Sequence, residues 1–250
     1  MTQPICRAYQ CKSRRLIRAH IIPRGFARDM KQGHPHNLKV SMDRVQATQH
    51  GVYDPEILCE RCDGTLGKLD DYALEVCRRF PQEHKIVSDG MFVMENVDGD
   101  QFARFVLSVL WRSSVTKRTE FRKVSLGPYE MRACEVIFGA KPLSSMPEYE
   151  LLVSRYKTVG RFDPAATYTS PARSTFEGAN GWAFALHGFR IMAKIDKRSL
   201  PSILRPAIVN GNTTLLGVFG DFHSTSEGKA MMNMKRATLS RLARSTTARG

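Results

Sequence analysis

Two cysteine pairs, Cys6 with Cys11 and Cys59 with Cys62, constrain the first part of this chain more than any other feature of the sequence. Thiolates are soft ligands, and four of them can close a tetrahedral zinc site that joins segments distant in sequence. The second pair has the C-x2-C spacing typical of such sites, and the four residues between Cys6 and Cys11 are within the range of a zinc loop. The sequence therefore predicts a structural Zn2+ bound by these four cysteines, with ordinary buried thiols as the alternative.

The net charge of the chain is strongly positive. At 250 residues, with 42% apolar and 25% charged residues, the composition is that of an ordinary globular protein of one or two domains, but the formal net charge of +14 is not ordinary. A basic balance favours a polyanionic partner, because each phosphate neutralised by Lys or Arg releases counterions. We therefore expect a nucleic acid as the partner, with a basic surface that has no specific partner as the alternative.

The sequence predicts no association with a membrane. No apolar run is long enough to cross a bilayer, and the N-terminus carries cysteines and arginines where a secretory signal needs an apolar stretch. We expect a cytoplasmic protein (in the host cytoplasm if a phage encodes it), where paired cysteines hold metal more often than they form disulfides. Cys77 and Cys134 lie on helical patterns and are expected to be small buried hydrophobic residues.

Positive charge is concentrated around His20. Residues 1–32 contain one acid, Asp29, and eight basic side chains: Arg7, Lys12, Arg14, Arg15, Arg18, Arg24, Arg28 and Lys31. We expect Arg15, Arg18 and Arg24 to contact phosphate groups, because a guanidinium can donate two parallel hydrogen bonds to one phosphate. A solvated basic face would give the same pattern.

Five motifs carry a resemblance to a known family: Ala19-His20-Ile21-Ile22-Pro23, Leu58-Cys59-Glu60-Arg61-Cys62-Asp63, Leu66-Gly67-Lys68-Leu69-Asp70-Asp71-Tyr72-Ala73, Leu107-Ser108-Val109-Leu110-Trp111-Arg112-Ser113-Ser114 and Leu126-Gly127-Pro128-Tyr129-Glu130. In this order they resemble the HNH, or ββα-metal, nucleases in their zinc-stapled form. They are most similar to a set of phage and bacterial HNH-like proteins. The resemblance covers about the first 140 residues.

The resemblance implies that His20 is the general base that activates a water for attack on phosphorus. It also implies that Asp63, together with Asp70, binds one divalent ion, Mg2+ or Mn2+. These two acids are seven residues apart and share a helix face. Two features depart from the family pattern: Ala19, before the histidine, cannot bind metal, and Asn37, the local candidate for the middle asparagine, lies far from the second cysteine pair. For Asp63, a helix N-terminal acid favoured by the macrodipole is an equal alternative.

Other histidines are weaker candidates. Residues 33–55 are polar and interrupted by Gly and Pro, so we expect mainly loop there. Its histidines, His34, His36 and His50, are candidates for a place near a metal, although loop histidines are more often simply exposed. His187 and His223 lie in or beside expected strands, where a structural role is favoured.

Hydrophobic periodicity predicts the remaining elements. A strand is expected over 16–22, a helix over 62–79 that Pro81 ends, and a hairpin around Asp89-Gly90. A helix capped by Asp98 or Asp100 is expected to bury Trp111, and another helix is expected over 128–139. Strands are expected over 149–156, 181–195 and 213–222.

These observations predict an α+β fold with four units. They are a zinc-bound HNH-like ββα unit over 1–80, a helical extension packed on it over 81–145, a small, mostly antiparallel β-rich region over 146–228, and a basic tail over 229–250. We expect a metal-dependent DNA endonuclease with a structural zinc site made by the four cysteines, and with a protein partner on the β-rich region as a further option. The alternative is a catalytically inactive, zinc-stabilised module that binds DNA or a protein as an adaptor or inhibitor.

Overall fold

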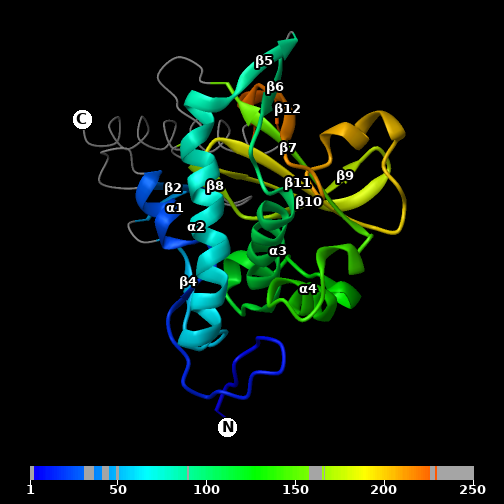
Figure 1. The fold of residues 1–250 in the computed structure, drawn as a ribbon. Helices are drawn as coiled ribbons and strands as arrows, with labels where there is room; N and C mark the ends of the chain where they lie inside the picture. Colours follow the sequence, from blue (N-terminus) through cyan, green and yellow to red (C-terminus); the bar gives the residue numbers. More distant parts are fainter. Residues whose placement is uncertain are drawn as a thin grey trace, which may run out of the picture.

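A computed structural model gives the fold of the chain (Figure 1). It describes residues 3–30, 37–40, 45–48, 51–88, 90–157, 165, 167–225 and 229, with the backbone alone at 37–40, 45–48, 167 and 223. The predictions for His34, His36, His50, Asp89 and the side chains of Asn37 and His223 therefore lie outside the described residues. Of the expected basic tail, Lys229 alone is described.

A short antiparallel pair followed by a long helix forms the N-terminal part of the fold. β1 (Ala19–His20) pairs with β4 (Tyr53–Asp54). The next helix or strand along the chain after β4 is α2 (Glu60–Glu83). In the register of this pair His20 lies opposite Tyr53. An isolated bridge between Leu16 and Cys59 ties the segment before β1 to the start of α2.

The strand expected over residues 16–22 is shorter than predicted. β1 covers two of these residues, and Ile21 and Ile22 turn into the core with 0% of their surface exposed. Pro23, the N-cap residue of α1 (Arg24–Asp29), ends the extended segment, because it has no N–H to donate to a neighbouring strand.

Helix α2 runs from the cysteine loop at one end of the molecule to the β5–β6 hairpin, formed by β5 (Lys85–Ser88) and β6 (Met91–Met94), at the other (Figure 1). Its predicted apolar face is confirmed, since Leu66, Leu69, Ala73 and Cys77 are all buried. The prediction that Pro81 ends the helix is wrong. Pro81 lies in the last turn, where the missing amide removes one hydrogen bond, and the His84 N–H still closes that turn on Phe80 O at 3.2 Å.

The helix α3 (Gly99–Val115) packs against α2 and α4 (Glu130–Ile137) and also contacts the sheet. Its predicted cap is confirmed, because the Asp98 carboxylate accepts from Gln101 N at 2.9 Å. Trp111 is 1% exposed, as expected for a core residue. The helix expected over 128–139 is present as a 3-10 turn that runs into α4. The 3-10 helices are η1 (Thr119–Phe121), η2 (Gly127–Tyr129), η3 (Leu143–Ser145), η5 (Ser202–Ala207) and η6 (Phe222–Ser224).

The main sheet is larger than the predicted β-rich region. In the described part of the chain it has ten strands in the order β3-β2-β8-β10-β11-β7-β12-β6-β5, with β9 paired to β10. The strands not yet given are β2 (Asn37–Val40), β3 (Val45–Thr48), β7 (Tyr149–Tyr156), β8 (Thr167–Thr169), β9 (Ala172–Phe176), β10 (Ala179–Leu186), β11 (Phe189–Ile195) and β12 (Leu215–Gly220).

The expectation of a small sheet confined to the C-terminal region is therefore wrong. Four strands come from the first half of the chain, namely β2, β3, β5 and β6, and the pairs β12–β7 and β2–β8 are parallel. The expected loop over 33–55 contains β2, β3 and β4. Pairing of β2 with β8 joins residues far apart in sequence, and a local hydrophobic pattern does not reveal such pairing.

One hydrophobic core joins the expected units. A single cluster of buried side chains runs from Cys6 to Leu215 and includes residues of the cysteine loop, the helices and the main sheet. The predicted mixed α+β class is confirmed at this level. Among the described residues, none of the helices combines the length and the apolar character that crossing a membrane requires.

Candidate metal centre and the site around His20

The four predicted cysteine ligands lie together. One sulfur atom each from Cys6, Cys11, Cys59 and Cys62 is within 4.8 Å of the others. The first pair comes from a loop that folds back on itself, since Cys6 N donates to Ser13 O at 2.9 Å and Cys11 N donates to Ala8 O at 3.0 Å. The second pair comes from α2, with Cys59 as its N-cap residue and Cys62 in its first turn.

The donor set and its spacing fit zinc. A tetrahedral site with Zn–S bonds of about 2.3 Å places the sulfur atoms about 3.8 Å apart, and Cys11 Sγ lies 3.8 Å from Cys59 Sγ. Two N–H donors reach the sulfurs. The backbone N of Cys59 is 3.4 Å from Cys6 Sγ, and Arg61 Nη2 is 4.0 Å from Cys11 Sγ. Such donors stabilise the negative charge that four thiolates bring to a divalent ion.

The thiol pKa values differ across the cluster. A backbone hydrogen bond at Ser13 lowers the pKa of Cys11 to about 7, whereas burial raises the pKa of Cys6 and Cys62 above its usual value. All six cysteines of the chain are unpaired. Four thiolates at this spacing would need a cation, because burial disfavours the charged form of Cys6 and Cys62.

His20 is held at the end of β1 by a buried arginine. Arg112 of α3 has 1% of its side chain exposed, and its Nη1 donates to His20 O at 2.9 Å. The same guanidinium donates to both carboxylate oxygens of Asp70 at 2.7 and 3.0 Å and to Ser108 Oγ at 3.0 Å. The His20 ring lies edge-on to the ring of Tyr53, with centroids 6.2 Å apart. Arg112 thus joins the predicted base to one predicted acid across three elements.

The two predicted acids have different surroundings. Both oxygens of Asp70 are occupied by Arg112, and its side chain is 13% exposed. Asp63 is half-buried in the first turn of α2, and no ion pair to its carboxylate is found within the described residues. Burial raises the pKa of Asp63, while the Arg112 charge opposes that shift. Of the two acids, Asp63 is the one whose carboxylate is available to a further ligand.

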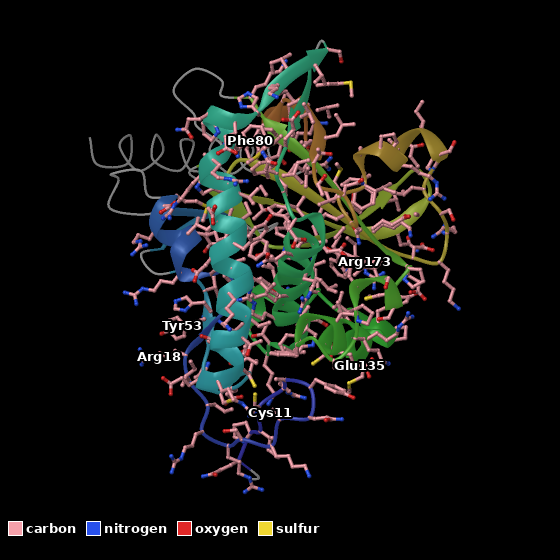
Figure 2. All side chains as sticks on the ribbon, in the orientation of Figure 1. Cys11, Arg18, Tyr53, Phe80, Glu135 and Arg173 are labelled. Atoms are coloured by element: carbon pink, nitrogen blue, oxygen red, sulfur yellow. The ribbon has the colours of Figure 1, made fainter. Side chains whose placement is uncertain are left out.

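The predicted phosphate-binding arginines lie on the exposed side of this region. Figure 2 shows Arg18 beside Tyr53 on the flank of α2, with Cys11 near the end of that helix. The Arg18 guanidinium is 5.4 Å from the Tyr53 ring centroid. Arg15 lines a surface cavity of about 430 Å³ that also borders Cys11, and Arg24 is exposed at the start of α1.

Sequence reasoning missed Arg112 and Tyr53 as site residues. Arg112 is a charged residue inside the apolar run of α3, and such a position in a sequence is itself a sign of a buried ion pair. Tyr53 gave no comparable signal, because its role follows from the pairing of β4 with β1. His187, for which a structural role was favoured, packs edge-on to Phe26 of α1, with the ring centroids 6.0 Å apart.

Comparisons of the chain with protein-family models, with curated proteins and with solved structures find no match. The arrangement around the cysteine cluster and His20 is therefore what bears on function.

Proposed function

We propose that this chain is an HNH-like protein that binds DNA through the unit formed by β1, β4 and α2 and hydrolyses phosphodiester bonds at His20. The observation that carries the proposal is the buried Arg112 guanidinium, which donates both to His20 O and to Asp70 of α2. β1 supplies the imidazole, the first turn of α2 supplies the Asp63 carboxylate, and the four cysteines connect the loop before β1 to that same turn. Zn2+ in this cluster would be structural, because all four of its positions would be filled by protein sulfur.

In this proposal His20 takes a proton from the attacking water. A general base needs geometry first, and the bond from Arg112 to His20 O fixes the backbone that carries the ring. The exposed guanidinium groups of Arg18 and Arg24 bind the phosphate oxygens and offset the charge that develops on them. Asp70 acts through Arg112 as a positioning residue, which replaces its expected role as a second metal ligand.

A divalent ion would be held by Asp63. Mg2+ is often bound by one or two carboxylates together with substrate phosphate and water, so a single carboxylate is the minimal set. When bound, such an ion stabilises the leaving oxygen and the developing charge. Ala19, with 0% of its surface exposed, supplies no further ligand.

Plasmid nicking tests this function. Supercoiled DNA is incubated with the zinc-loaded chain and Mg2+ or Mn2+, beside His20→Ala, Asp63→Asn and the control His84→Gln, which changes a histidine at the opposite end of α2. We expect nicking by the wild type and the control, and its loss in His20→Ala with zinc still bound. Equal nicking by wild type and His20→Ala would contradict the proposal.

The ion pair of Asp70 with Arg112 favours a second function. It leaves Asp63 as the one predicted acid without an ion pair among the described residues, and Ala19 adds no ligand, so the same scaffold could bind DNA, or a protein as an adaptor or inhibitor, without cleaving anything. Salt-dependent DNA binding by the wild type, with no nicking under either metal, would support this DNA-binding module in place of the nuclease.

A further inference from the structure

Two arginines from different segments meet on one tyrosine next to His20. The guanidinium carbon of Arg18 lies 5.4 Å from the Tyr53 ring centroid, and that of Arg118 lies 6.0 Å from the same centroid. Arg18 precedes β1, Tyr53 belongs to β4, and Arg118 follows α3. Both arginines are exposed and the tyrosine is half-buried, so the group lies at the surface; Figure 2 shows Arg18 and Tyr53 of this group on the flank of α2.

A buried contact fixes the Arg118 segment to β4. The hydroxyl of Thr116 donates to the carboxylate of Asp54, which is 4% exposed and directly follows Tyr53. The backbone N–H of Arg118 donates to Thr116 Oγ1 at 3.2 Å. The approach of Arg118 to Tyr53 is therefore held by the fold, in addition to the attraction between the cation and the ring.

This arrangement leaves hydrogen-bond donors free for a phosphate. The attraction of a guanidinium to the face of an aromatic ring uses none of its N–H donors. This contact also restricts the side chain before any ligand arrives, which lowers the entropy lost on binding. One Arg118 nitrogen lies 3.4 Å from Glu120 Oε1, so an acid also orients this guanidinium. Two ordered cations beside His20 complement a polyanion with closely spaced charges.

We propose that Arg18 and Arg118, ordered on the ring of Tyr53, form a clamp for the phosphodiester backbone beside His20. The clamp rests on the proposed binding of DNA at this unit and adds Tyr53 and Arg118 to it. Tyr53 acts as a positioning residue: its ring orders the two guanidinium groups and does not itself stack on a base.

The salt dependence of DNA binding tests the clamp. Fluorescence anisotropy of a labelled duplex is measured over a series of KCl concentrations with the full-length, zinc-loaded chain. The variants are Arg18→Gln, Arg118→Gln, their double variant, and Tyr53→Leu alone and combined with that double variant. Tyr53→Phe keeps the ring, and Arg205→Gln removes the same charge from exposed η5, in the golden stretch at the right of Figure 1.

Each clamp arginine is expected to reduce the slope of log Kobs against log salt by about 0.9 and the affinity roughly five- to tenfold at low salt. Tyr53→Leu is expected to weaken binding several-fold in the wild type and to have no further effect in the double arginine variant. Tyr53→Phe and Arg205→Gln should bind like the wild type. Zinc content and thermal midpoint are compared for all variants, so that lost folding is not taken for lost contact.

Three results would overturn the clamp. Slopes for Arg18→Gln and Arg118→Gln equal to that of Arg205→Gln would mean that neither arginine contacts phosphate. If Tyr53→Leu weakened DNA binding in the double arginine variant as much as in the wild type, the ring of Tyr53 would itself stack on a base. A wild type with no salt-dependent DNA binding would remove the proposed function itself, and this outcome is distinct from unaltered slopes in a chain that binds.

Discussion

Arg112 is the residue on which the site around His20 most depends. It is almost fully buried and its guanidinium contacts Asp70, Ser108 and the carbonyl of His20. A buried ion pair contributes little net stability compared with apolar residues of the same size, but removal of one partner leaves an uncompensated charge. The pair therefore sets geometry more than it sets stability.

Arg112→Met is expected to lower the free energy of unfolding by about 3 to 5 kcal/mol, because Asp70 then remains buried without its partner. The double variant Arg112→Met, Asp70→Leu should recover most of that loss. Urea unfolding of the wild type, both single variants and the double variant measures this coupling. If the losses of unfolding free energy in Arg112→Met and in Asp70→Leu simply added up in the double variant, Arg112 and Asp70 would not be energetically coupled.

His187 gives the chain a pH-dependent stability. It lies in the turn between β10 and β11 at a φ of 50°, with a side chain 12% exposed. Burial, together with the charge of Arg155, lowers the pKa of His187 below its usual value of 6.5, against the opposing charge of Asp29. The unfolded chain then takes up the proton at a higher pH than the folded chain, so stability falls as the pH drops below about 6.5 towards the folded-state pKa.

The variant His187→Asn tests this dependence, since Asn tolerates a positive φ and does not titrate in this range. Between about pH 7.5 and pH 5.5, we expect the wild type to lose more unfolding free energy than the variant, by at most about 1.4 kcal/mol. Urea midpoints at both pH values measure the difference. Identical losses in the two proteins would mean that His187 does not supply the pH dependence.

Among the elements, α2 links the cysteine cluster to the rest of the fold. Its first turn carries Cys59 and Cys62, and its apolar face continues through the common core to the β5–β6 hairpin. Gly64 and Gly67 weaken the helix near this end, because glycine loses more backbone entropy than other residues. A metal that fixes the two cysteines would offset that weakness.

Removal of the metal with a chelator is expected to raise hydrogen exchange in residues 6–18 and 59–67, while β10 and β11 stay protected. Cys62→Ser should lose the metal, whereas the matched control Cys77→Ser, a buried cysteine of the same helix outside the cluster, should keep it. Exchange monitored by mass spectrometry, together with metal analysis, checks both. A chelated chain with unaltered exchange in the two segments would contradict a structural role.

Elements with local signals were predictable from the sequence, and elements made by distant pairing were not. The helix from Gly99 to Val115 combines a capping aspartate with a clear apolar period, and both are local. β1 is two residues long because the chain turns inward at Ile21, and β2 gains its place from β8 far along the chain. The four cysteines could be grouped by their spacing, whereas Tyr53 and Arg118 meet only through tertiary structure.

At the scale of the whole molecule, the cysteine cluster and the main sheet belong to one core. Among the described residues, the largest of three clusters of buried side chains contains residues of the cysteine loop, of α2 and α3 and of the main sheet, so the unit around His20 rests on the sheet through these two helices. In the proposed function, the net charge of +14 would supply a general attraction to DNA, and the exposed Arg18 and Arg118 near β1 and β4 would supply its local anchor. A protein partner on the β-rich region stays a prediction from the sequence.

The proposed function requires that DNA binds at the unit formed by β1, β4 and α2. Hydrogen exchange of the zinc-loaded chain, with and without a short duplex, tests this claim whether or not the DNA is cut. We expect DNA to protect residues 15–24, 51–56 and 116–119 and to leave η5 and β9 unaltered. Protection confined to η5 and β9, with none around His20, would contradict DNA binding at this unit.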